Sequence, residues 1–145
     1  MNKSIMVLLS LFLLALGALA IFVVSERTSA NGISESTLLL INSIKNEEVM
    51  WDLNYLGLMP ELTGTALELE DSHEDINPLL VDALVDEDKF VAAHVLLTFR
   101  TSKIDTLTAR EWNGLEVQVS SNGEATFEGN NLRGLQKRWK ERLHK

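Results

Sequence analysis

The longest apolar stretch of the chain runs without interruption from Ile5 to Val24. It carries no charge, and only Ser10 and Gly17 fall outside the strongly apolar residue types. A helix over this stretch rises about 1.5 Å per residue and spans roughly 30 Å, which is the thickness of the hydrocarbon core of a bilayer. The pattern therefore predicts a transmembrane anchor within residues 1–25, in contact with membrane lipid.

A cleaved signal peptide is the alternative interpretation of this segment. Lys3 and the amino terminus would form its basic start, and Thr28-Ser29-Ala30 would offer small residues before a cut. The apolar run is longer than the roughly 7 to 15 residues of a signal-peptide core, which favours the anchor. Lys3 precedes the run and Arg27 follows it beside an acidic residue, so the small charge bias places the N-terminus in the cytoplasm. Both interpretations put the remaining residues outside the cytoplasm.

The residues after the anchor divide into a short linker and one domain. Residues 26–33 are small and polar, and residues 34–145 suffice for a single domain. Ser34 has the chemistry of a helix N-cap, and apolar residues at helical spacing follow it. The same spacing continues further along the chain, so this helix ends near Asn46 or runs on to Tyr55.

Residues 61–75 fit either a helix or a strand. The run from Thr65 to Glu70 alternates in polarity like a strand, but its Ala, Leu and Glu residues are good helix formers. We favour a helix here. The whole segment 34–104 is therefore predicted to be helical.

Two further helices are predicted within this segment. Asn77 and Pro78 have the pattern of an N-cap followed by proline at the first helical position. An apolar stripe follows until Asp86 to Asp88 interrupt it, and the second helix then extends from about Glu87 to Thr98.

The residues INPLLVDALVDEDKFVAAHVLLT, from Ile76 to Thr98, resemble one HEAT repeat. In that family a first helix ends at an Asp-rich turn, and a second helix opens with small residues like Val91-Ala92-Ala93. A single helix pair cannot bury both of its faces, so other elements are expected to cap it. The resemblance implies a protein-contact surface, which we place around Asp86 to Leu97.

Between Leu115 and Glu128 the spacing of apolar residues changes from that of a helix to the two-residue period of a β-strand. Apolar and polar residues alternate on both sides of Asn122-Gly123, and Asn-Gly is typical of the turn of a β-hairpin. Trp112, just before the hairpin, is a candidate packing anchor. The C-terminal part of the domain, residues 112–143, is thus predicted to be one hairpin followed by a helix.

The final helix is predicted to begin after Asn130-Asn131. Apolar residues recur at helical spacing and form one stripe, and basic residues occupy the rest of the helix. The stripe consists of Leu132, Leu135, Trp139 and Leu143. A basic amphipathic helix either packs on a core or lies on a membrane surface. We favour packing, because an isolated hairpin is marginal in water and needs a cover.

Composition removes several classes of function. The chain has no Cys, which excludes disulfides, thiolate metal sites and Cys nucleophiles. The formal net charge of −8 makes the protein a poor general binder of nucleic acid, because phosphate contacts need Lys and Arg. Acidic residues concentrate between Glu61 and Phe90 and basic residues between Arg133 and Lys145, which we interpret as two solvated faces.

Three histidines and a group of acidic residues are the candidates for chemistry. His94 lies in a helix that is apolar nearly all round, so we interpret it as a core histidine whose burial would disfavour its charged form. Glu70 and His73 have a spacing found in di-iron helical bundles, but such sites need a second copy and two further carboxylates. His144 lies next to the chain terminus. The acidic group consists of Glu68, Asp71, Glu74 and Asp75, and it lacks the residue order of a calcium loop.

The sequence therefore nominates no catalytic residue, no cofactor-binding residue and no metal ligand. The predicted fold is α+β and mainly helical: an N-terminal transmembrane helix, then a small helical domain with one C-terminal β-hairpin covered by a final amphipathic helix. The predicted function is that of a non-enzymatic, membrane-anchored protein-interaction module with a protein partner. An extracytoplasmic enzyme whose site is not visible as a motif, and an acidic metal-binding protein, are the alternatives.

Overall fold

The computed structural model describes residues 32–54, 57–104 and 107–144. The predicted anchor at 1–25, and the linker up to residue 31, lie outside the described residues. Among the helices of the described residues, none combines the length and the apolar character that crossing a membrane requires. The described residues form an α+β fold, as predicted.

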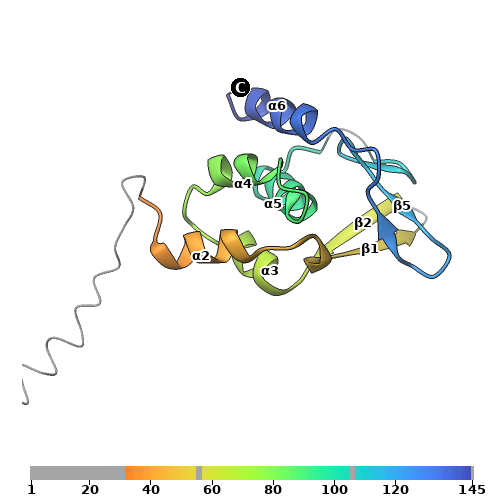
Figure 1. Cartoon of the computed structure of the whole chain (residues 1–145), viewed down its shortest axis with the longest axis horizontal. Coiled ribbons are helices and arrows are strands. Elements are labelled where there is room, and N and C mark those ends of the chain that lie inside the picture. The colour runs from red at the N-terminus through yellow and green to blue at the C-terminus, as the bar shows by residue number, and fades with distance from the viewer. Residues whose placement is uncertain (1–31, 55–56, 105–106, 145) are drawn as a thin grey trace, which may run out of the picture.

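The helices gather on one side of the domain and the strands on the other (Figure 1). Helix α5 (Phe90–Thr101) lies at the centre of the helical side. It packs against α4 (Asn77–Ala83) and α3 (Gly64–Glu70), and α2 (Glu35–Ser43) packs on α3. The helix predicted after Ser34 thus ends before Asn46, and the helix favoured within 61–75 covers 64–70.

Helix α5 is the core of the domain and offers no free face. Every residue from Phe90 to Thr98 is buried. A helix that is apolar nearly all round requires such enclosure, and α5 receives it from helices on several sides. The prediction that Asp86 to Leu97 form a contact surface is therefore wrong for the helix, because only the turn before it reaches solvent.

A second correction concerns the segment after α2. A short 3₁₀ helix (Asn46–Glu48) leads into strand β1 (Val49–Asn54), which pairs antiparallel with β2 (Gly57–Leu62). The segment 34–104 is therefore not wholly helical, and the C-terminal hairpin is not the only one. The apolar spacing of 49–56 fits a helix, but alternate residues of β1 and β2 face the core, and that long-range burial selects the strand.

The C-terminal strands form two short hairpins in place of one. Strand β3 (Glu111–Trp112) pairs with β4 (Leu115–Glu116), and β5 (Gln118–Val119) pairs with β6 (Ala125–Thr126). The predicted hairpin around Asn122-Gly123 therefore exists but starts at residue 118. Leu115 pairs with Trp112, the residue before the turn, and not with a residue of the later hairpin. This pairing is possible because Asn113 and Gly114 both adopt positive φ angles, 51° and 87°, as a tight two-residue hairpin turn requires. Trp112 is buried, as its proposed packing role requires.

Helix α6 (Leu132–Leu143) closes the domain over α4. The Asn131 side chain accepts a hydrogen bond from the Gly134 amide and caps the helix, as predicted. Leu135 and Trp139 are buried, and the outer members of the stripe, Leu132 and Leu143, pack partly buried on the same core. Gln136 donates to the Val81 carbonyl of α4. The apolar stripe of α6 thus packs on the core of the domain.

Candidate functional site

The His94 ring is a structural element of the core. Its Nδ1 accepts a hydrogen bond from the Trp139 indole at 2.8 Å, and its Nε2 lies 3.3 Å from the Trp112 carbonyl oxygen. Since Nδ1 accepts, the ring proton is on Nε2, which donates to that carbonyl. Burial lowers the pKa of His94 to about 3, and the cationic side chains of Arg138 and Arg142 act in the same direction. The ring is neutral and enclosed, as predicted.

A hydrogen-bonded network extends from His94 and holds α6 to the rest of the domain. The Thr98 hydroxyl donates to the His94 carbonyl, and the Asn113 amide donates to the Thr98 hydroxyl. The Arg142 guanidinium donates to the side-chain oxygen Oδ1 of Asn113 and lies over the Trp139 ring at 5.1 Å. These bonds connect α5, the β3–β4 turn and α6. The buried polar groups of this region therefore have hydrogen-bond partners within the protein, and their presence needs no bound ligand to explain it.

The segment that joins α3 to α4 is held by the side chain of Arg100 from α5. The Arg100 guanidinium donates to the backbone carbonyl oxygens of four residues in this loop and to the Asn77 side chain. The four carbonyls belong to Leu69, Glu70, Ser72 and Glu74. Arg100 therefore ties the end of α3 and the loop after it to α5.

The carboxylate of Glu74 has a structural partner of its own. It accepts a hydrogen bond from the Ser34 amide at 3.0 Å, which lowers the pKa of Glu74. His73 is exposed near Glu70, and in the described ranges no three His, Asp or Glu side chains gather closely enough to hold a metal ion. The structure thus does not bring the predicted acidic residues together as a ligand set.

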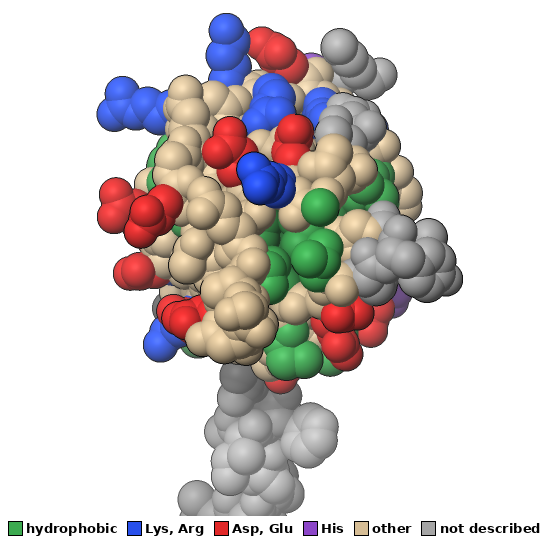
Figure 2. All heavy atoms as spheres, turned by 90° about the vertical axis from the view of Figure 1, so that its right-hand side faces the viewer, with side chains coloured by type: hydrophobic (Ala, Val, Ile, Leu, Met, Phe, Trp, Pro, Cys, Tyr) green, Lys and Arg blue, Asp and Glu red, His purple; other side chains and the backbone are tan. Residues whose placement is uncertain are grey.

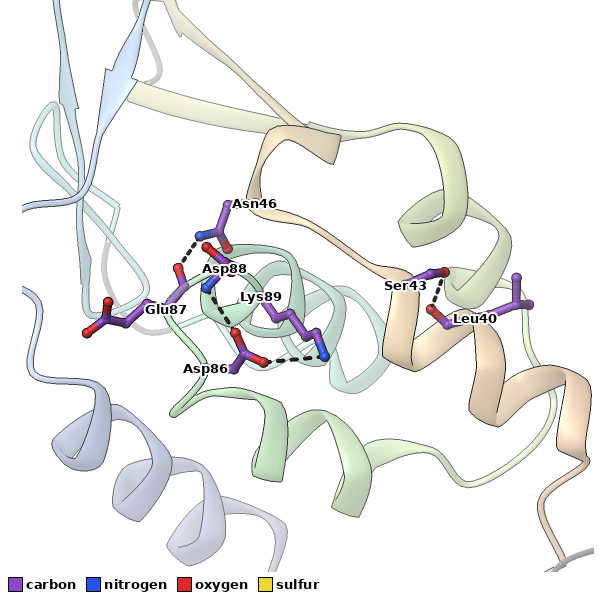
Figure 3. A network of polar contacts seen from close by, with 7 residues as sticks. All are labelled: Leu40, Ser43, Asn46, Asp86, Glu87, Asp88 and Lys89. Atoms are coloured by element: carbon purple, nitrogen blue, oxygen red, sulfur yellow. Dashed lines mark hydrogen bonds and ion pairs between the residues drawn. The ribbon is translucent and has the colours of Figure 1, made fainter.

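The Asp86–Asp88 turn is held in place by Asn46 (Figure 3). The Asn46 side chain donates to the Glu87 carbonyl and accepts from the Val91 amide, which caps the start of α5 from another part of the chain. Asp86 accepts from the Asp88 amide and forms an ion pair with Lys89 at 3.3 Å. The polar groups of this turn are largely used in joining α4, α5 and the segment before β1.

The β1–β2 ribbon differs from these regions, because much of its apolar surface faces solvent. Val49 and Trp51 lie on the face that packs on the core. Met50 and Met59 lie on the opposite face and are 54% and 43% exposed. Leu53, near the end of the ribbon, is 50% exposed. Figure 2 shows the side of the molecule on which the strands lie, with hydrophobic side chains gathered near its centre and acidic ones around them.

The outer edge of β1 presents backbone groups without a partner. Asn54 pairs with Gly57 across the hairpin loop, and Thr63 donates to the Glu48 carbonyl at the other end. These two pairs fix the alternation of the ladder: even-numbered residues of β1 bond to β2, and odd-numbered residues face away from it. Val49, Trp51 and Leu53 therefore direct their N–H and C=O groups away from β2. The Val49 N–H donates to the Asn46 carbonyl, whereas the backbone groups of Trp51 and Leu53 meet no backbone partner within the described residues.

A groove follows this edge, and we call it the edge groove. One wall is formed by residues between Asn46 and Trp51, the other by residues between Gly123 and Phe127, and its volume is about 640 Å³. Val49, Met50 and Trp51 all line it. Because consecutive side chains of a strand point to opposite faces, three in a row border the groove only if it runs along the strand edge.

The floor of the edge groove is aromatic. The Trp51 and Phe127 rings lie 5.9 Å apart, and Trp51 also contacts the Trp112 ring edge-on at 5.8 Å. The indole N–H of Trp51 is buried and has no acceptor among the residues that the structure describes. Most buried polar groups in proteins are hydrogen-bonded, so this donor differs from the other buried polar side chains of the domain.

The sequence analysis missed this site. The signal was present, because VMWDLN alternates between residues that face the core and residues that face solvent. That alternation is weak in a run whose apolar residues also recur at helical spacing. Gly123 and Glu124, by contrast, lie in the turn that the sequence did predict, but nothing local showed that this turn would face β1.

Comparison with known proteins adds no relative. No protein-family model matches the chain, and neither a curated protein nor a solved structure matches it significantly.

Proposed function

We propose that this chain is a non-enzymatic, membrane-anchored module that binds a partner protein through the edge groove and the adjoining outer face of the β1–β2 ribbon. The observation that carries the proposal is the combination of Met50 and Met59, both exposed on the outer face, with the unpaired backbone groups of Trp51 and Leu53 at the edge of β1. Contiguous exposed apolar surface beside unused backbone donors and acceptors is characteristic of interaction sites.

The location in the proposal rests on the apolar run Ile5–Val24 and its flanking charges. A linker of only a few residues keeps the domain close to the bilayer, on the extracytoplasmic side. A partner would therefore be another protein at that membrane surface. Nucleic acid is an unsuitable partner, because Glu47 and Glu124 are the charged residues that line the groove.

Site-specific photo-crosslinking in intact membranes tests this proposal. A photoreactive amino acid is placed at Met50, and in a matched variant at Leu39, which is 65% exposed on α2, away from the groove. We expect a discrete crosslinked protein from position 50 that is absent from position 39. The measurement is a gel-shifted band identified by mass spectrometry.

Equal crosslinking from both positions, or none from position 50, would overturn the proposal. Fractionation of the same membranes supplies the control for location. A chain recovered in the soluble fraction with a new N-terminus near residue 21 or 31 would show cleavage and contradict the anchor.

A further inference from the structure

We infer that the edge groove accepts an extended segment of the partner protein as an additional β-strand on β1, with a Lys or Arg of that segment beside Glu47 and Glu124. This inference rests on the proposed function and specifies the chemistry of the partner. The occupant is a segment of another protein, and a second copy of this chain is treated below as a contrary outcome.

The spacing of the unpaired backbone groups selects an extended partner. Trp51 and Leu53 present both N–H and C=O groups, and Val49 presents its C=O, at every second residue, which corresponds to a repeat of about 6.6 Å along the strand. Leu53 lies just beyond the edge groove, beside residues 108–111. A helix exposes no free backbone groups along its length, so it cannot match such a row. A strand matches it, and main-chain pairing of this kind is a recurrent mode of peptide recognition.

The two edges of the ribbon are not equivalent. On β2 the outward-facing residue opposite Trp51 is Pro60, which has no N–H to donate. Proline on an edge strand is one of the devices that prevent a further strand from pairing. Strand β1 contains no Pro and no Lys, so its edge lacks this protection along the groove.

The side chains around the edge favour an apolar segment. Alternate residues of an added strand would point toward Trp51 and Phe127 on the groove floor, where aromatic surface is available.

The charge of the groove specifies one further feature of the segment. Glu47 and Glu124 line it, no Lys or Arg does, and neither carboxylate has a described ion-pair partner. A cationic residue in the segment would therefore be attracted at one end of the groove. A second copy of this chain would bring the same two carboxylates and a net charge of −8, which disfavours self-pairing.

Selection of peptides on the full-length chain in detergent micelles is the first experiment. A displayed library of random ten-residue peptides is the probe. We expect enrichment of peptides with apolar residues at alternate positions and a Lys or Arg near one end. Enrichment of helical patterns with apolar residues three and four apart, or no enrichment at all, would overturn the inference.

Backbone modification of a selected peptide gives the sharper test and needs no change to the protein. Two versions are made, each N-methylated at alternate residues, so that one loses the amides facing β1 and the other loses the remaining amides. We expect the first version to bind at least tenfold more weakly than the second. Equal affinity of the two versions would show that side chains alone are recognised.

Variants of the chain test the same point from the other side. Leu53→Pro removes an outward N–H without removing a ladder bond to β2, and the matched Leu53→Ala keeps that N–H. We expect Leu53→Pro to weaken peptide binding about tenfold and Leu53→Ala to change it less than threefold, measured by fluorescence anisotropy. Glu124→Lys should weaken binding in a salt-dependent manner, with exposed Glu68→Lys as its control.

The outcomes separate this inference from the proposed function. If position 50 crosslinks a partner but neither N-methylation nor Leu53→Pro matters, the surface binds protein and the added strand is wrong. If position 50 crosslinks nothing, the proposed function itself fails. Sedimentation that shows a dimer of the chain, dissociated by Leu53→Pro, would replace the partner segment by a second copy.

Discussion

The two ends of the core handle their buried polar groups in opposite ways. Around His94 both ring nitrogens are engaged, and Thr98 and Asn113 continue the network to α6. Around Trp51 the indole N–H and the outward backbone groups of Trp51 and Leu53 have no partner within the described residues. A satisfied buried group is explained by folding, whereas an unsatisfied one costs about 1–3 kcal/mol and points to a missing partner. The comparison therefore supports a stabilising role for the His94 region, and it is consistent with the binding that we propose for the Trp51 region.

Among the substitutions that test this comparison, Trp139→Ala is expected to lower the stability of the domain most. Trp139 is fully buried, and its loss leaves a cavity and removes the donor to His94. We expect the free energy of unfolding to fall by about 3–5 kcal/mol, measured by urea denaturation of the full chain. A loss below about 1 kcal/mol would show that α6 is not held through this residue.

Acidification is expected to lower the stability of the domain by a smaller amount. The unfolded chain protonates His94 below about pH 6.5, whereas the folded chain resists protonation until about pH 3. The unfolded state therefore binds more protons in this range, and stability falls as the pH falls below 6.5. We expect a loss of about 2 kcal/mol at pH 5 relative to pH 7.5, at about 1.4 kcal/mol per pH unit.

The control for the pH experiment is a pair of matched variants. His94→Gln can keep both hydrogen bonds but cannot titrate, so it should abolish most of the loss. His73→Gln, at an exposed position, should leave the loss unchanged. An identical dependence of stability on pH in both variants would show that His94 does not cause the acid sensitivity.

The smallest effect compares the two indoles directly. Trp139→Phe removes a satisfied N–H, and we expect it to cost about 1 kcal/mol more than packing alone explains. Trp51→Phe removes an N–H without an intramolecular partner in the described chain, so it should lack this additional cost. Urea unfolding of both variants measures the difference. Equal costs would remove the physical distinction between the two regions.

Local signals predicted much of the helical side. Ser34 and Asn131 cap helices as expected, because a cap depends on residues within one turn. The apolar stripe of α6 could also be predicted from the sequence, since Leu135 and Trp139 recur at helical spacing. The core position of His94 followed from its apolar helix.

Long-range contacts decided what the sequence analysis missed. Residues 49–54 became a strand because their alternate side chains could be buried against α5, which no local pattern reveals. Arg100 was not singled out, because the carbonyls it binds belong to a loop 26 to 31 residues away. The Asn113-Gly114 turn had a readable signal, the same Asn-Gly pair that identified the later turn, but it lies in a hairpin of only two residues per strand.

The hydrogen bond between Ser34 and Glu74 has a mechanical consequence for a tethered domain. The chain enters the domain at buried Ile33, the next amide binds the Glu74 carboxylate, and the Glu74 carbonyl binds Arg100 of α5. A pull applied through the linker is thus passed to the central helix within two residues of entry. If residues 1–25 anchor the chain as proposed, tension on the linker would reach α5 through Glu74 as well as through α2.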